Sequence, residues 1–181
     1  MSKYGHKQIN RGDLVVSNPL LRCISDGASL FFPACDGSET IADSQEVFKS
    51  GVDTDFRGWN LSRPSKATRK TPAKAYRLME NATIKEMFTF LSQVDLNVLC
   101  VTEHQIKAFC KKHHDWLCAE GYGTLFLTKK NWKAPATLDN LFVAHVFVIS
   151  GGLYVYAIRF EYGSVWYADG RRRLVVPKLV A

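Results

Sequence analysis

Residues of the types that bind metals gather in one short stretch of the chain. Cys110 and His113 are spaced so that both would lie on one face of a helix, and His114 and Cys118 lie just downstream. Zinc commonly takes cysteine and histidine ligands. No pair of cysteines elsewhere has a matching short spacing, so the stretch favours a core cysteine with histidines at a helix C-terminus, where positive charge suits the dipole. We expect no metal site and no cofactor.

The same stretch contains the parts of a thiol nucleophile. A cysteine becomes reactive when a base lies beside it, and Cys110 has two nearby candidates in His113 and His114. The five cysteines of the chain are irregularly spaced, which is typical of reduced thiols that pack as small apolar side chains. The sequence therefore favours a non-catalytic binding protein, with a small enzyme around Cys110 and His113 as one alternative.

A second alternative enzyme site centres on His145. This residue interrupts an apolar run over residues 141–149, and strand alternation places it on the same side as Tyr154 and Tyr156. A buried histidine needs a hydrogen-bond partner, which a tyrosine hydroxyl could supply. A core histidine with its hydrogen bonds satisfied is the favoured interpretation.

The charge of the chain points toward an acidic partner. Lysine and arginine number 24 against 17 aspartate and glutamate residues, for a formal net charge of +7. Basic residues concentrate in segments 63–74, 107–133 and 171–173, which favours nucleic acid, or else an acidic protein, as the partner. Phosphate contacts would make binding depend steeply on salt. The predicted contacts are Lys66, Arg69, Lys70, Lys107, Lys111, Lys112, Lys129, Lys130, Arg171, Arg172 and Arg173.

A third hypothesis is a protein-interaction or inhibitor module of mobile-element origin. Here the tryptophans Trp59, Trp132 and Trp166 would be exposed anchors. Trp166 is also a separate candidate site residue. It would lie opposite Arg173 across a hairpin, where the guanidinium can stack on its ring, and this interpretation competes with nucleic-acid contact by the arginine run 171–173.

Two helices and a sheet must position these side chains. Thr83 with Glu86, and Thr102 with Gln105, form capping-box patterns that begin helices over 83–94 and from 102 to about 117. The apolar stripe of each helix predicts packing against a sheet, and we expect both helices on one face.

The end of the chain predicts a four-stranded antiparallel meander. The first hairpin joins 141–149 to 153–160 through Gly151-Gly152, with Ile149 opposite Tyr154. The second joins 164–168 to 171–176 through Asp169-Gly170 and leaves the last strand at an edge of the sheet. We therefore expect an α+β fold with an antiparallel sheet.

Composition predicts one domain over residues 13–181, preceded by a flexible basic arm over 1–12. A proline-containing basic stretch at 61–73 is a possible internal boundary. No apolar run approaches the length needed to span a bilayer, so we expect no membrane partner. The N-terminus lacks the apolar segment of a secretory signal, which predicts a cytoplasmic protein. The sequence does not predict an oligomeric state.

Several motifs together resemble a group of uncharacterised bacterial hypothetical proteins. They are His114-Asp115-Trp116-Leu117, the stretch 121–127 and the ending Val175-Val176-Pro177. The resemblance implies a shared α+β fold and carries no known activity, so it assigns no functional residue.

Overall fold

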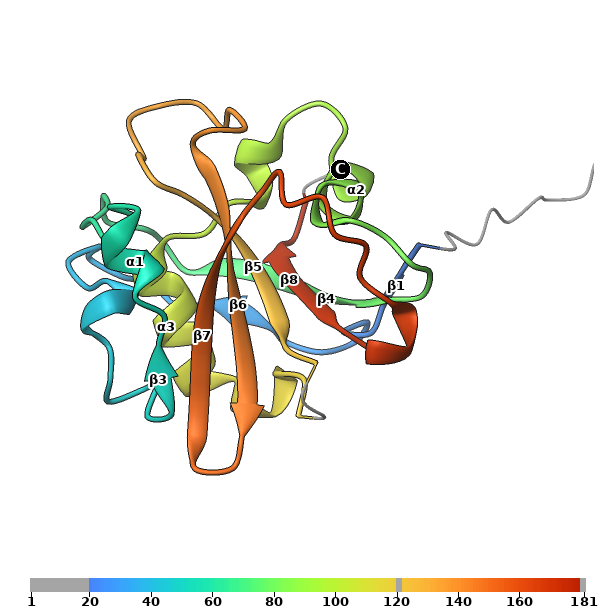
Figure 1. The fold of residues 1–181 in the computed structure, drawn as a ribbon, viewed down its shortest axis with the longest axis horizontal. Helices are drawn as coiled ribbons and strands as arrows, with labels where there is room; N and C mark the ends of the chain where they lie inside the picture. The colour runs from blue at the N-terminus through green and yellow to red at the C-terminus, as the bar shows by residue number, and fades with distance from the viewer. Residues whose placement is uncertain (1–19, 120–121, 180–181) are drawn as a thin grey trace, which may run out of the picture.

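The computed structural model describes residues 20–119 and 122–179, and the predicted basic arm over 1–12 lies outside them. These residues form a mixed α+β structure around one eight-stranded sheet (Figure 1). The strands are β1 (Leu21–Cys23), β2 (Phe31–Phe32), β3 (Gly51–Val52), β4 (Thr71–Leu78), β5 (Thr124–Lys129), β6 (Leu141–Ile149), β7 (Gly152–Arg159) and β8 (Arg173–Pro177). The α-helices are α1 (Asp55–Gly58), α2 (Ile84–Leu91) and α3 (Glu103–Lys112). Short 3-10 turns occupy Ile41–Asp43, Leu96–Leu99, His114–Trp116 and Ala168–Gly170.

The strands follow the spatial order β1-β4-β8-β5-β6-β7-β3, and β2 also pairs with β4. Most pairs are antiparallel, but β5 with β8 and β3 with β7 run parallel. The predicted antiparallel sheet is thus a mixed one. No helix among the described residues is long and apolar enough to cross a membrane.

The helices α2 and α3 cover opposite faces of the sheet (Figure 1). Phe126 of β5 packs in a core cluster with Phe109 of α3, whereas its neighbour Leu125 packs in a second cluster with Phe88 of α2. Successive side chains of a strand point to opposite faces. The prediction that both helices share one face is therefore wrong, because the central strands are apolar on both sides and each side needs a cover.

Both predicted capping boxes are present. Thr83 Oγ1 accepts from the backbone N–H of Glu86 at 3.2 Å, and the Glu86 carboxylate accepts from the backbone N–H of Thr83 at 2.8 Å. Thr102 and Gln105 make the same reciprocal pair at the start of α3. These motifs are local, which is why they can be read from sequence.

The first predicted hairpin forms, with its register displaced by two residues. Ile149 pairs with Gly152, and His145 pairs with Tyr156 rather than with Ile158. The turn is therefore Ser150-Gly151. A displacement by two keeps every side chain on its predicted face, so His145, Tyr154 and Tyr156 still share one side.

The second predicted hairpin does not form. Strand β8 lies inside the sheet between β4 and β5, and Trp166 makes an isolated bridge with Ala82 rather than pairing with Arg173. The chain turns through Ala168–Gly170 and a left-handed Arg171 (φ 46°), which carries β8 away from the preceding segment. The meander therefore ends after β7, and the predicted edge position of residues 171–176 is wrong.

Candidate functional site

His145 is fixed inside the sheet in one tautomer. Its side chain is 2% exposed, and its Nε2 lies 3.1 Å from the backbone oxygen of Tyr122. A carbonyl can only accept, so Nε2 carries the hydrogen and Nδ1 is unprotonated. Burial lowers the pKa of His145 to about 3, against the opposing effect of the Tyr122 hydrogen bond. His145 is therefore neutral at physiological pH. It is a buried histidine with a hydrogen-bond partner, as favoured from the sequence, but the partner is the Tyr122 backbone carbonyl rather than a tyrosine hydroxyl.

Gly123 makes room for this imidazole. Its backbone has φ of +77°, and a Cβ built at this position would lie 2.1 Å from His145 Nε2. Both the backbone conformation and the close approach therefore require glycine here. The same edge of the ring, Nε2 with Cδ2, faces Gly123, so the edge that carries Nδ1 faces away from it.

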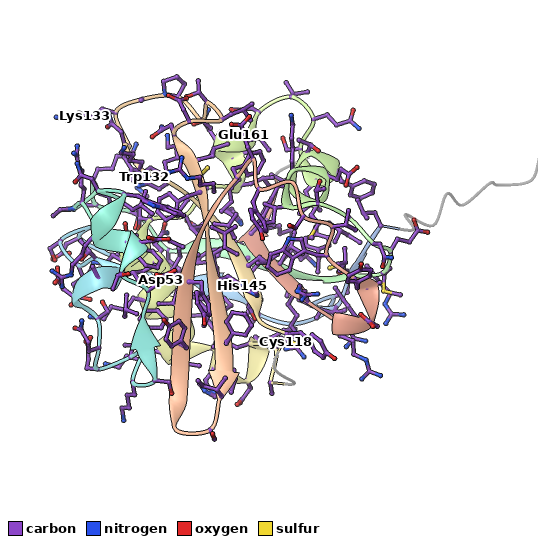
Figure 2. All side chains as sticks on the ribbon, in the orientation of Figure 1. Asp53, Cys118, Trp132, Lys133, His145 and Glu161 are labelled. Atoms are coloured by element: carbon purple, nitrogen blue, oxygen red, sulfur yellow. The ribbon has the colours of Figure 1, made fainter. Side chains whose placement is uncertain are left out.

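His145 lies at one wall of an open hollow with a volume of about 530 Å³, which we call the aromatic hollow. The strands β6 and β7 supply most of its wall, the segment after β7 supplies Tyr162, Trp166 and Arg172, and the C-cap of α1 supplies Trp59. Five aromatic residues line it: Trp59, Phe147, Tyr156, Tyr162 and Trp166. Figure 2 shows His145 near the middle of the molecule, on the β6–β7 ribbon. Aromatic side chains dominate this surface, and the aromatic hollow presents ring faces and edges to solvent.

The rings around His145 contact one another closely. The His145 and Phe147 ring centroids lie 4.0 Å apart, and Trp166 meets His145 edge-on at 5.0 Å. Phe147 in turn meets Tyr156 edge-on at 5.4 Å, and Tyr156 is 44% exposed. Such contacts hold aromatic side chains in defined orientations. The exposed ring of Tyr156 is therefore held in place by its neighbours.

Two arginines line the same hollow, and each lies against a tryptophan. The Arg159 guanidinium lies 4.7 Å from the centre of the Trp59 ring, and that of Arg172 lies 4.5 Å from the Trp166 ring. Arg172 also donates from Nη1 to the backbone oxygen of Tyr167 at 3.1 Å. The hollow therefore has a guanidinium-on-indole stack contributed by each of two separate segments of the chain.

A second hollow adjoins the aromatic hollow, and a third adjoins the second. The edge hollow, of about 380 Å³, shares Trp59 and Arg159 with the aromatic hollow. It also shares Lys130 with the basic hollow, of about 540 Å³, which is lined by residues 63–66 and 130–133. Trp132 and Lys133 of the basic hollow lie at the upper left of Figure 2, away from His145. Two of the three predicted basic segments, 63–74 and 107–133, thus meet at the basic hollow.

Several predicted nucleic-acid contacts are instead structural. Lys107 Nζ forms an ion pair with Glu39 at 2.7 Å and a second one with Glu46. Lys129 is buried and donates to Asn97 and to a backbone carbonyl. Arg173 donates to the backbone oxygens of residues 116 and 117. These three cations already have partners inside the fold, which weighs against their assignment as nucleic-acid contacts.

The remaining predicted contacts are divided among separate surfaces. Lys66 and Lys130 line the basic hollow, and Arg172 lines the aromatic hollow. Lys70 and Lys112 approach the Phe31 ring, at 3.9 and 5.4 Å from its centre, at a different place. The exposed side chains Arg69, Lys111 and Arg171 line none of the three hollows.

The candidate metal-ligand and nucleophile residues, Cys110, His113, His114 and Cys118, form no such site. Cys110 is fully buried in the core, and burial raises the pKa of its thiol far above the ordinary value. His113 packs against the rings of Phe31 and Phe109, whereas His114 is exposed. The Sγ atom of Cys118 donates to the backbone oxygen of Arg171 at 3.6 Å. Among the described residues, histidine, cysteine and acidic side chains form no group of three that could hold a metal ion.

The sequence did not identify the residues that join the hollows. Trp59 was predicted to be an exposed anchor, and it is half-buried under Arg159. Trp132 and Trp166 are also half-buried, with Lys129 over the first and Arg172 over the second. The sequence feature that could have indicated this site is Arg159, a charged residue at the end of an otherwise largely apolar strand. Its partner lies on α1's C-cap and is distant in sequence.

No family model, curated protein or solved structure matches this chain. The resemblance to uncharacterised bacterial proteins therefore stays a prediction, and the site has to be interpreted from its own chemistry.

Proposed function

We propose that this protein is a non-catalytic binding protein for single-stranded nucleic acid, which takes an unpaired base into the aromatic hollow. The observation that carries the proposal is the pair of arginine-on-tryptophan stacks beside exposed rings. Surfaces that bind single strands combine aromatic platforms for the bases with cations for the phosphates. Both parts are present in this hollow.

The chemistry of His145 supports binding over catalysis. A general base works best when its pKa lies near the working pH, whereas burial holds the pKa of His145 at about 3. With Nε2–H engaged by Tyr122, the ring offers an acceptor nitrogen and no spare donor. The small-enzyme hypothesis finds less support, because the Cys110 thiol is held protonated by burial.

A tetranucleotide titration tests the proposal. We expect DNA or RNA tetranucleotides to quench tryptophan fluorescence at low salt and to lose affinity as salt rises. Tyr156→Ala should weaken binding by about 1–3 kcal/mol, which is the usual contribution of one stacked base. Tyr156→Phe keeps the ring and should bind like the original protein.

Tyr167→Ala is the matched control. Tyr167 is 62% exposed and does not line the aromatic hollow, so its removal should leave affinity unchanged. Absence of binding to any tetranucleotide at low salt, or equal losses in Tyr156→Ala and Tyr167→Ala, would refute the proposal. Binding of an acidic protein, without binding of any tetranucleotide, would also contradict the proposal.

A further inference from the structure

We infer that the bound strand continues from the aromatic hollow over the β7 edge into the basic hollow, so that the ligand is a polynucleotide chain rather than a free nucleotide. This inference rests on the proposed function and adds a path and a second contact region to it. It follows from how the three hollows are joined and from the charges along them.

The edge of the sheet leaves this path open. Strand β3 pairs with β7 only at Tyr154 and Val155, so among the described residues no strand covers the outer side of β7 beyond that point, where the Ala157 backbone N–H donates instead to the Asp53 carboxylate at 3.3 Å. The Trp59–Arg159 stack lies at this part of the edge, which no strand covers, and lines both the aromatic and the edge hollow. A strand that leaves the first hollow therefore meets an aromatic ring and a guanidinium at the crossing.

Hydrogen bonds tie the second and third hollows together. Asn140, in the edge hollow, accepts at Oδ1 from the backbone N–H of Asn131 in the basic hollow at 2.7 Å. Arg63, in the basic hollow, donates from Nε to Asn60 in the edge hollow at 3.2 Å. The walls of these two hollows are thus built on each other, and Lys130 belongs to both.

The charges along the path are strongly one-sided. Six cationic residues line the three hollows: Arg172, Arg159, Lys130, Lys133, Arg63 and Lys66. Among the described residues that line them, Asp139 is the one carboxylate. Trp132 offers an aromatic side chain in the basic hollow. Repeated cations with interspersed aromatic side chains suit a flexible backbone with unpaired bases, whereas a duplex hides the faces of its bases.

A length series of oligonucleotides tests this path. We expect the affinity for single strands, measured by fluorescence anisotropy, to rise at least about tenfold from four to ten nucleotides and then to level off. The double variant Lys130→Gln/Lys133→Gln should abolish this rise and leave tetranucleotide binding unchanged. It should also reduce the slope of log affinity against log salt by about 1.4 for the long strand, at about 0.7 per lost phosphate contact.

The control is Lys85→Gln/Lys111→Gln, which removes the same charge from α2 and α3, outside the three hollows. It should keep the full length dependence. If tetranucleotides bind but longer strands bind no better, the path is refuted while the proposed function stands. The path is also refuted if both double variants lose affinity equally, or if a ten-base-pair duplex binds as well as the single strand. Failure of all oligonucleotides to bind refutes both proposals.

Discussion

A buried glutamate at the start of α3 should make stability fall as pH rises. Glu103 is 4% exposed, and its Oε2 accepts from the backbone N–H of Ile41 at 2.7 Å and from the Ser62 hydroxyl at 3.3 Å. Burial raises the pKa of Glu103 from 4.5 to about 7, although these two hydrogen bonds lower it, and the charge of Asp43 adds to the rise. The carboxyl group therefore titrates near neutrality in the folded protein.

The direction and size of the effect follow from this shift. Between pH 4.5 and 7 the folded state keeps a proton on Glu103 that the unfolded state has lost, so the free energy of unfolding falls as pH rises. At about 1.4 kcal/mol per pKa unit, the whole shift corresponds to about 3 kcal/mol. Glu103→Gln removes the titration and keeps an acceptor oxygen for Ile41.

Urea unfolding of both proteins between pH 4.5 and 8 measures the effect. The stability of Glu103→Gln relative to the original protein should rise by about 3 kcal/mol across this range. Glu86→Gln is the control, because Glu86 is the exposed glutamate of the other capping box and its pKa is lowered. The difference in free energy of unfolding between Glu86→Gln and the original protein should stay level above pH 4.5. A level difference for Glu103→Gln would refute the reasoning, because it would mean that water reaches the carboxylate.

Two further predictions concern His145 and its neighbour. The pKa of His145 is lowered from 6.5 to about 3, so as pH falls the unfolded state takes up a proton before the folded state does. The free energy of unfolding of His145→Gln should therefore rise by up to about 5 kcal/mol relative to that of the original protein between pH 6.5 and 3, measured by the same unfolding assay. A difference that does not change with pH would contradict this. Gly123→Ala should destabilise the fold by about 2–4 kcal/mol, from left-handed strain plus the clash with His145. Gly27→Ala, with a similar φ of +79° and nothing within 4 Å, should cost only the strain, about 1–2 kcal/mol, and equal costs would show that the clash relaxes.

The parts of the fold that sequence predicted are those that depend on neighbouring residues. The capping boxes at Thr83 and Thr102 and the β6–β7 hairpin involve groups close in the chain. The hairpin register was displaced by two because Gly151-Gly152 offers more than one two-residue turn, and alternation alone cannot tell registers of equal parity apart. The faces were still assigned correctly.

The parts that sequence missed depend on distant segments. The Asp169-Gly170 pair is a typical hairpin signal, yet β8 finds β4 and β5 as partners because a strand that is apolar on both sides is better buried inside the sheet. The aromatic hollow joins Trp59 to Arg159 and Trp166 to Arg172. An arginine-on-aromatic stack was expected near the end of the chain, but with Arg173 opposite Trp166 through a hairpin that does not exist, whereas the structure places Arg172 on Trp166. The pair of Trp59 with Arg159 joins residues far apart in the chain, and no local pattern indicates it.

The position of β8 has a consequence for the order in which the protein folds. Strands β1, β2 and β4 connect to the β5–β6–β7–β3 half of the sheet only through β8, among the described residues. Ala73 pairs with Pro177 across most of the chain's length, so this closure is a highly non-local step. During synthesis, the edges of β4 and β5 that pair with β8 would stay unpaired until residues 173–177 leave the ribosome. Of the eight described strands, the one made last would thus be the one that joins two partial sheets into one.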